Sequence, residues 1–101
     1  MNLIQILLPL YSNEGALFPQ SVFESVKKDL TNTFGGLTAY TRSPASGLWK
    51  EEGKTVHDEI IIYEIMTDNI DTNYWNSYKL KLQQQFRQDE IIIRNSEIRL
   101  L

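Results

Sequence analysis

The sequence predicts one α+β domain in which a four-stranded antiparallel sheet carries two helices on one face. Its 101 residues suit a single domain spanning 1–101. Four apolar runs of strand length and two stretches of helical periodicity follow one another as strand, helix, strand, strand, helix, strand. The composition, with 42% hydrophobic and 23% charged residues, is typical of globular proteins.

The first strand and the first helix are predicted from apolar spacing. Residues 2–11 are almost continuously apolar, as in a strand covered on both faces, and Pro9 weakens pairing near the end. A helix follows over residues 21–34, where apolar side chains recur at helical intervals. Ser21 has capping-box spacing to a glutamate, although a proline in the first turn is an equal alternative. Gly35 and the glycine after it end this helix with a left-handed cap.

The two middle strands are expected to be joined through an irregular segment. A strand over Leu37–Arg42 is followed by a break at 43–47, rich in serine and glycine. The chain then resumes an extended path and turns in a glycine-containing hairpin loop at 51–54. The return strand, Thr55–Met66, is the strongest extended signal in the chain.

The second helix is predicted over residues 71–87, with caps offered between 68 and 71. Its apolar stripe consists of Tyr74, Trp75, Tyr78, Leu82 and Phe86. A last strand covers residues 90–100.

These six elements predict the split βαβ arrangement, a ferredoxin-like βαββαβ sandwich. Right-handed crossovers place both helices on one face of the sheet, with strand order 4-1-3-2.

The central strands are apolar on both faces, although two helices cover only one. In the third strand Ile61, Tyr63 and Ile65 alternate with a second apolar set. We expect the set of Ile61 to face away from the helices. Such a face needs to be covered, because each apolar side chain left exposed loses the burial free energy of about 1.5–3 kcal/mol. A homodimer through the free sheet face is preferred over an apolar ligand or the chain's own 43–55 loop.

Charge and composition exclude several classes of function. The net charge is −3 and no basic stripe is present, so neither nucleic acid nor an anionic membrane surface is expected as partner. The chain has no cysteine, which excludes disulfides, thiolate metal ligands and thiol catalysis and fits a cytoplasmic protein. No signal peptide or membrane-spanning segment is recognised in the sequence. No cofactor is expected.

Two titratable residues are candidate catalytic groups. His57, the single histidine, shares a strand face with Glu59, a pair that could act as general base or as part of a metal site. One histidine and one carboxylate do not complete a metal site, so no metal is predicted, and a solvated strand end is the simpler interpretation. Glu64 lies on an apolar side of the same strand, where a carboxylate is costly unless paired. It is either a structural ion-pair partner of Arg42, Arg94, Arg99 or Lys79, or a functional acid with a raised pKa.

Three further residues are candidate ligand contacts. Tyr40, Arg42 and Trp49 border the predicted 43–55 loop, and loops on a rigid scaffold often carry binding sites. Arg42 could clamp a carboxylate or phosphate beside an aromatic wall. Trp49 equally fits a packing lid or an anchor in a dimer interface.

Several segments resemble a small group of uncharacterised bacterial proteins of this length. They are Leu7–Tyr11, Phe34–Tyr40, Gly47–Lys50, Asp58–Glu64 and Phe86–Glu90, so the resemblance spans nearly the whole chain. It implies a bacterial source and an α+β domain, with no established activity. The predicted topology also resembles the dimeric α/β-barrel superfamily, which includes monooxygenases, isomerases and ligand-binding regulators. The Asn–Trp–His set of its haem-degrading members is not met, because His57 precedes Trp75 and lies on a strand.

Two functions remain open from the sequence. The preferred one is a small cytoplasmic homodimeric binding or regulatory domain. The alternative is a cofactor-free enzyme of dimeric-barrel type, a monooxygenase or isomerase. The enzyme would need the side chains of Tyr40, Arg42, Trp49, His57 and Glu64 to converge on one cavity.

Overall fold

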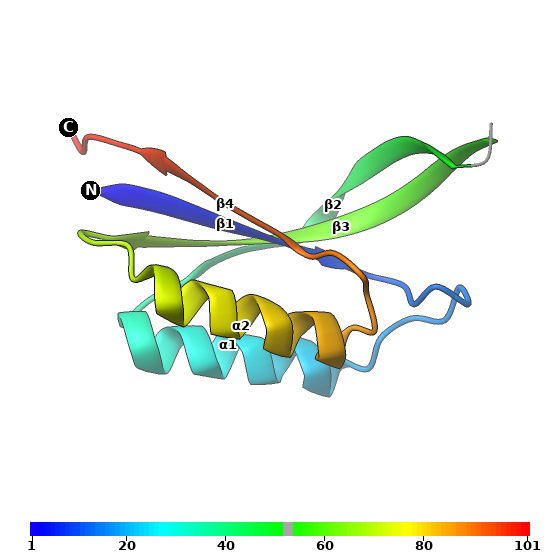
Figure 1. Cartoon of the computed structure of the whole chain (residues 1–101), viewed down its shortest axis with the longest axis horizontal. Helices are drawn as coiled ribbons and strands as arrows, with labels where there is room; N and C mark the ends of the chain where they lie inside the picture. Colours follow the sequence, from blue (N-terminus) through cyan, green and yellow to red (C-terminus); the bar gives the residue numbers. More distant parts are fainter. Residues whose placement is uncertain (52–53) are drawn as a thin grey trace.

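Six elements follow one another in the predicted order in the computed structural model. They are β1 (Asn2–Pro9), α1 (Gln20–Phe34), β2 (Thr38–Glu51), β3 (Lys54–Thr67), α2 (Thr72–Gln85) and β4 (Ile92–Glu97). The structure describes the backbone of residues 1–51 and 54–101, and the side chains of 1–40 and 59–101. The strands form one antiparallel sheet in the order β2-β3-β1-β4, which confirms the predicted ferredoxin-like fold. Both helices lie on the same face of this sheet (Figure 1).

The helix ends follow local rules, with one correction. α1 begins after Pro19, which makes no side-chain capping bond, so the predicted capping box at Ser21 is wrong and the pre-set φ of −59° at Pro19 starts the helix instead. Gly35 ends α1 in the left-handed region at φ 82°, as predicted, and its N–H donates to the carbonyl of Thr31 at 2.8 Å. Asp71 caps α2 by accepting the N–H of Tyr74 at 3.1 Å.

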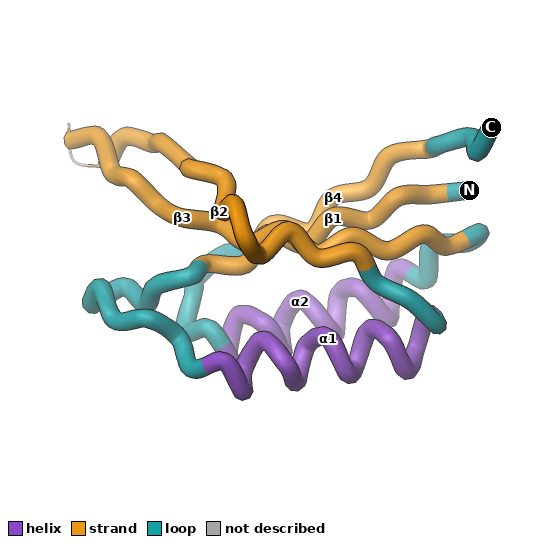
Figure 2. Tube along the Cα trace, turned by 180° about the vertical axis from the view of Figure 1, so that it is seen from behind, coloured by secondary structure: helices purple, strands orange, loops and turns teal. Residues whose placement is uncertain are grey.

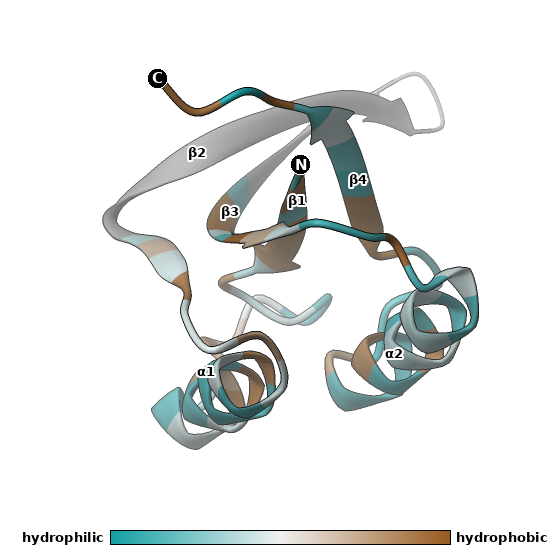
Figure 3. Ribbon diagram, turned by 90° about the vertical axis from the view of Figure 1, so that its left-hand side faces the viewer, coloured by the Kyte–Doolittle hydropathy of each residue, from teal (hydrophilic) through white to brown (hydrophobic). Residues whose placement is uncertain are grey.

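The core lies between the sheet and the two helices, the two layers that Figure 3 shows end-on. Each layer contributes residues at its own period, two for the strands and 3.6 for the helices. The buried set includes Ile4, Ile6 and Leu8 of β1, Ile61, Tyr63 and Ile65 of β3, Phe23, Val26 and Leu30 of α1, and Trp75, Tyr78 and Leu82 of α2. The predicted apolar stripe of α2 therefore packs inward.

One predicted face is inverted in the structure. Ile61, Tyr63 and Ile65 were expected to face away from the helices, yet they are at most 5% exposed and lie against them. Ile62 and Glu64 lie on the other side. Alternation shows which residues share a face, but an apolar pattern on both sides does not show which face meets the helices.

The predicted break at 43–47, and with it the irregular 43–55 loop, is wrong. β2 runs unbroken through this segment and pairs with β3 on both sides of a β-bulge. Residues 41–44 lie opposite a single residue of β3, so Pro44 falls within the bulge, where its missing N–H is tolerated. Residues 52–53 of the predicted hairpin loop lie outside the described residues.

The β2–β3 hairpin reaches beyond the rest of the sheet. β1 pairs with β3 from Ile60 to Thr67, whereas β2 pairs with it down to Lys54. The hairpin is thus a two-stranded ribbon beyond the end of β1. It rises on the side of the sheet away from the helices (Figure 2).

Candidate functional site

The sheet face that the helices leave uncovered carries both apolar and polar side chains. We call it the free face. On β1 and β3 it consists of Leu3, Gln5, Leu7, Ile60, Ile62, Glu64 and Met66, and β4 and β2 add Ile92, Arg94, Thr38 and Tyr40.

A chain of hydrogen bonds crosses the free face from one edge of the sheet to the other. We call these four residues the polar row: Arg94 of β4, Gln5 of β1, Glu64 of β3 and Tyr40 of β2. Gln5 lies directly opposite both Arg94 and Glu64 in the strand register, which brings the side chains together. Strand pairing therefore aligns three members of the row, and Tyr40, which is paired with Ile62, reaches Glu64 diagonally.

The bonds of the polar row converge on one carboxylate. Gln5 Nε2 donates to Glu64 Oε1 at 2.7 Å, and the Tyr40 hydroxyl donates to Glu64 Oε2 at 3.3 Å. Arg94 Nε donates to Gln5 Oε1 at 2.8 Å, so the guanidinium reaches Glu64 only through the amide. Glu64 is half-buried and holds its position through two neutral donors.

Apolar side chains surround the polar row. Leu7 is registered with Ile62 on one side and Ile92 on the other, and Leu3 with Met66. Leu3, Leu7 and Ile62 are half-buried, while Met66 and Ile92 are 52% and 51% exposed. Tyr40 is 50% exposed.

A cavity of about 320 Å³ opens beside Glu64 at the edge of the sheet. It lies where α1 ends, β2 begins and β3 finishes. Its lining residues are Leu3, Phe34, Gly35, Gly36, Leu37, Thr38, Glu64, Ile65 and Met66. Among these described lining residues Glu64 alone carries a charge. The volume is at the lower end of those found for small-molecule sites.

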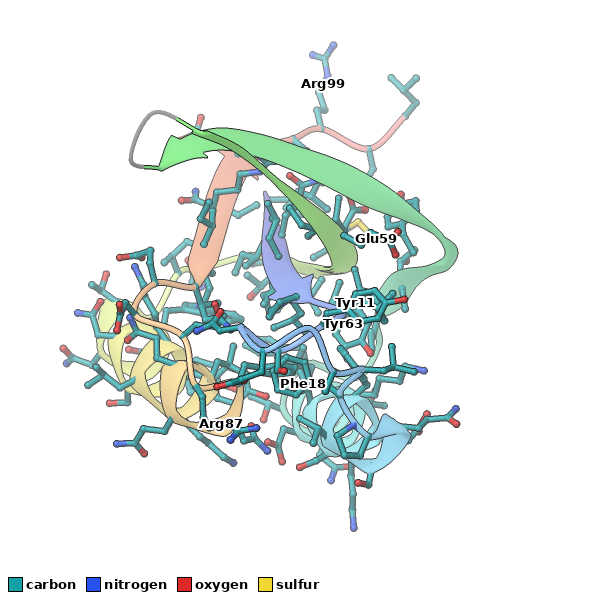
Figure 4. All side chains as sticks on the ribbon, turned by 90° about the vertical axis from the view of Figure 1, so that its right-hand side faces the viewer. Tyr11, Phe18, Glu59, Tyr63, Arg87 and Arg99 are labelled. Atoms are coloured by element: carbon teal, nitrogen blue, oxygen red, sulfur yellow. The ribbon has the colours of Figure 1, made fainter. Side chains whose placement is uncertain are left out.

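The structure brings together two of the predicted site residues, Tyr40 and Glu64. The side chains of Arg42, Trp49 and His57 lie outside the described residues, so the rest of that set stays a prediction. The backbone pairs Leu48 with His57 in the hairpin. Glu59, the expected companion of His57, is exposed, and Figure 4 labels it on β3.

The expected ion-pair partners of Glu64 are only partly found. Arg94 approaches it indirectly, and Lys79 forms a salt bridge with Glu90 instead. Gln5 was not predicted as a site residue. Its signal in the sequence is that it interrupts the alternation of Leu3 and Leu7 on an otherwise apolar strand face.

A second polar feature is buried between the sheet and the helices. The Tyr63 hydroxyl has no hydrogen-bond partner among the described residues, and the residue is fully buried. Burial, with a smaller effect of the Glu24 charge, raises the pKa of Tyr63 to about 12. On α2, Tyr78 donates to Asp29 Oδ2 at 3.3 Å and Lys81 donates to the same oxygen at 3.0 Å, which ties the helices together.

The described side chains include no group of three histidine, aspartate or glutamate residues placed to hold a metal ion. None of the described helices has the length and apolar character needed to cross a bilayer.

Comparison with known proteins gives structural likeness only. Neither a protein-family model nor a curated protein sequence matches the chain. Among solved structures it is similar to the divalent cation tolerance protein CutA1 from Thermus thermophilus, with a TM-score of 0.63 and 14% identity over 97% of this chain and 84% of that one. A variant of CutA1 from Pyrococcus horikoshii gives 0.62 and 14%, over 100% and 86%.

A second kind of protein is equally similar. A phage SAM lyase, solved with S-methyl-5'-thioadenosine, gives a TM-score of 0.62 and 12% identity over 95% of this chain and 80% of that one. Identities this low show a shared fold and nothing of a shared ligand. The chain has the ferredoxin-like fold that CutA1 and the phage lyase also adopt.

Proposed function

We propose that this chain is a small cytoplasmic homo-oligomeric domain that binds or regulates, and that its copies associate through the free face. The observation that carries the proposal is the free face itself. It presents Leu3, Leu7, Ile62, Met66 and Ile92 around a single polar row, and neither of the two helices covers it. Apolar area of this kind marks interaction sites.

The size of the exposed surface supports a missing partner. The chain exposes 7087 Å², whereas a compact monomer of 11.8 kDa exposes about 5,900 Å². Its radius of gyration is 14.2 Å, compared with about 12.7 Å expected for 101 residues. The excess area of about 1,200 Å² shows that the chain is less compact than a typical monomer of its mass.

The protruding hairpin supports the same conclusion. Beyond Ile60, no third strand of the described residues lies beside the ribbon of β2 and β3. An isolated two-stranded ribbon is marginally stable in water and needs a further strand or a packed layer. A second copy of the chain supplies that layer.

The charges of the polar row favour a second copy of the chain as the partner that covers the free face. The polar row ends in a guanidinium on β4 and has its carboxylate near β2, the opposite edge. A second copy that meets the free face with its row reversed places Arg94 near the partner's carboxylate. The free face is therefore complementary to itself, as an interface between identical chains requires.

Light scattering across a concentration series tests the proposal. We expect the wild-type chain to be oligomeric at tens of micromolar. Ile62→Arg places a charge at the centre of the free face and should weaken association at least a hundredfold. The matched control is Leu80→Arg, which changes a residue 62% exposed on α2 and should leave association unchanged.

Circular dichroism of both variants separates assembly from folding. A wild-type chain that is strictly monomeric would end the proposal, and so would a folded Ile62→Arg that associates like wild type. An effect of Leu80→Arg as large as that of Ile62→Arg would move the interface to the helical layer.

A cofactor-free enzyme is the second candidate, and one observation favours it. The Glu64 carboxylate accepts a hydrogen bond from Tyr40 next to the cavity, so an acid–base pair lies beside a space for substrate. Since one similar structure is a SAM lyase, S-adenosylmethionine is the first substrate to try, with S-methyl-5'-thioadenosine as the product to detect. Absence of turnover leaves the binding function as the one supported.

A further inference from the structure

We propose that the cavity beside Glu64 binds a small organic cation, such as a quaternary ammonium group, with Glu64 as its counter-charge. This inference rests on the proposed binding function and names the class of ligand that the domain takes. The cavity shares Glu64 with the proposed interface, so the cation competes there with Arg94 of a second copy.

The C-terminal end of α1 brings negative charge to the cavity. α1 ends at Gly35, and both Gly35 and Gly36 line the cavity. Among the described residues no backbone N–H reaches the carbonyls of residues 32–34, and the last turn of α1 contains no basic residue. The partial negative charge of a helix C-terminus is therefore uncompensated at this wall.

The Glu64 carboxylate is oriented and still has free acceptor positions. Each of its oxygens accepts one bond, from Gln5 or from Tyr40, and each keeps a second lone pair. These donors fix the orientation of the carboxylate before any ligand arrives. A preorganised, half-buried carboxylate attracts a cation more strongly than one in bulk water.

Other walls of the cavity are apolar. Leu3, Phe34 and Met66 line the same cavity. They suit the alkyl groups of an organic cation, and an aromatic ring adds a cation–π contribution. Phe34 is held in place by stacking on Trp75, with ring centroids 5.4 Å apart.

Other ligand classes fit this cavity less well. A hard metal ion takes six or more oxygen ligands, and Glu64 is the one carboxylate among the described lining residues. An anion meets both the carboxylate and the negative helix end. A neutral apolar ligand leaves the charge of Glu64 unused.

NMR titration of the ¹⁵N-labelled chain with choline chloride tests the proposal. We expect saturable shifts, at millimolar concentration, of the amides of Gly35, Gly36 and Thr38. The neutral isostere 3,3-dimethylbutan-1-ol should bind at least tenfold more weakly, and sodium chloride should cause no saturable shift there.

Two variants identify the counter-charge. Glu64→Gln should weaken choline binding at least tenfold, while it keeps an acceptor for Tyr40 or Gln5. Glu59→Gln makes the same change on an exposed residue of the same strand and should alter the affinity less than twofold. Equal binding of the neutral isostere, shifts located elsewhere, or full affinity in Glu64→Gln would each overturn the inference.

Light scattering on the same samples keeps the two proposals separate. An oligomer that ignores choline contradicts the cation site and leaves the proposed assembly standing. A monomer that binds choline through Glu64 contradicts the assembly and supports the site.

Discussion

The two faces of the sheet use the same strands and end in different surroundings. On the helix side Ile4, Ile6 and Leu8 are at most 1% exposed, whereas their neighbours Leu3 and Leu7 on the free face are only half-buried. Both sets are apolar, but the single chain buries only one of them completely. The comparison shows that apolar composition alone does not decide burial, because the helices cover one face of the sheet and leave its equally apolar neighbours partly exposed.

The largest predicted effect on stability comes from truncating one side chain on each face of the sheet to alanine. Ile6→Ala removes a fully buried side chain and should lower the free energy of unfolding by about 2–5 kcal/mol. Leu7→Ala, its neighbour on the free face, should cost less than about 1 kcal/mol in dilute protein, where the face is open to water. Urea unfolding monitored by circular dichroism measures both.

Protein concentration sharpens this first comparison. If copies cover the free face, the cost of Leu7→Ala grows with concentration and that of Ile6→Ala does not. If Ile6→Ala and Leu7→Ala lowered the free energy of unfolding equally at every protein concentration, the two faces would be buried to the same degree, contrary to the structure.

The next largest effect concerns the buried phenol of Tyr63. Its pKa is raised from 10.0 to about 12 in the folded chain, so folding favours its neutral form. The resulting stability is complete below pH 10 and is lost as the pH rises from 10 to about 12, by about 2–3 kcal/mol. Tyr63→Phe should make the stability curve flatter over this interval.

Neutral pH provides the internal control for Tyr63. There the hydroxyl has no hydrogen-bond partner in the described part of the chain, so Tyr63→Phe should change the free energy of unfolding by less than about 1 kcal/mol. A large loss at pH 7 would reveal a hydrogen-bond partner for the phenol. Burial and the Asp29 charge also raise the pKa of Tyr78, which extends alkaline destabilisation beyond this interval.

The smallest predicted effect concerns pairing across the polar row. Arg94→Glu and Glu64→Arg should each weaken self-association about five- to tenfold, which corresponds to roughly 1 kcal/mol. The double exchange should restore most of the affinity if each charge meets its opposite on a second copy. Sedimentation equilibrium measures the three affinities, and purely additive losses would contradict the reversed-row arrangement.

Most of the fold could be predicted from local patterns. The spacing of Trp75, Tyr78 and Leu82 gave α2 its buried side, and Gly35 marked the end of α1 because its left-handed conformation needs no Cβ. The continuity of β2 could not be predicted. Ser43 and Pro44 are turn residues by local rules, but a bulge in an edge strand accommodates them because only one side of the strand is paired.

The candidate site was predicted less completely than the fold. Glu64 and Tyr40 stood out because a carboxylate on an apolar strand face needs a partner and Tyr40 borders the segment expected to form a loop. Their link to Gln5 and Arg94 depends on the register of the four strands, which one-dimensional spacing does not contain. The prediction of which face of β3 meets the helices was wrong because Ile61 and Ile62 are equally apolar, so the sequence does not distinguish the two faces.

The bulge at residues 41–44 has a consequence for how proteins of this shape could diverge. Four residues of β2 face one of β3, an odd surplus, so the hairpin runs out of phase with the strand that leads into it. Losing or gaining one residue there would restore the phase and re-aim the whole ribbon, while β1, α1 and α2 keep their places. A single-codon deletion at this point could therefore change which assemblies form more than most substitutions would.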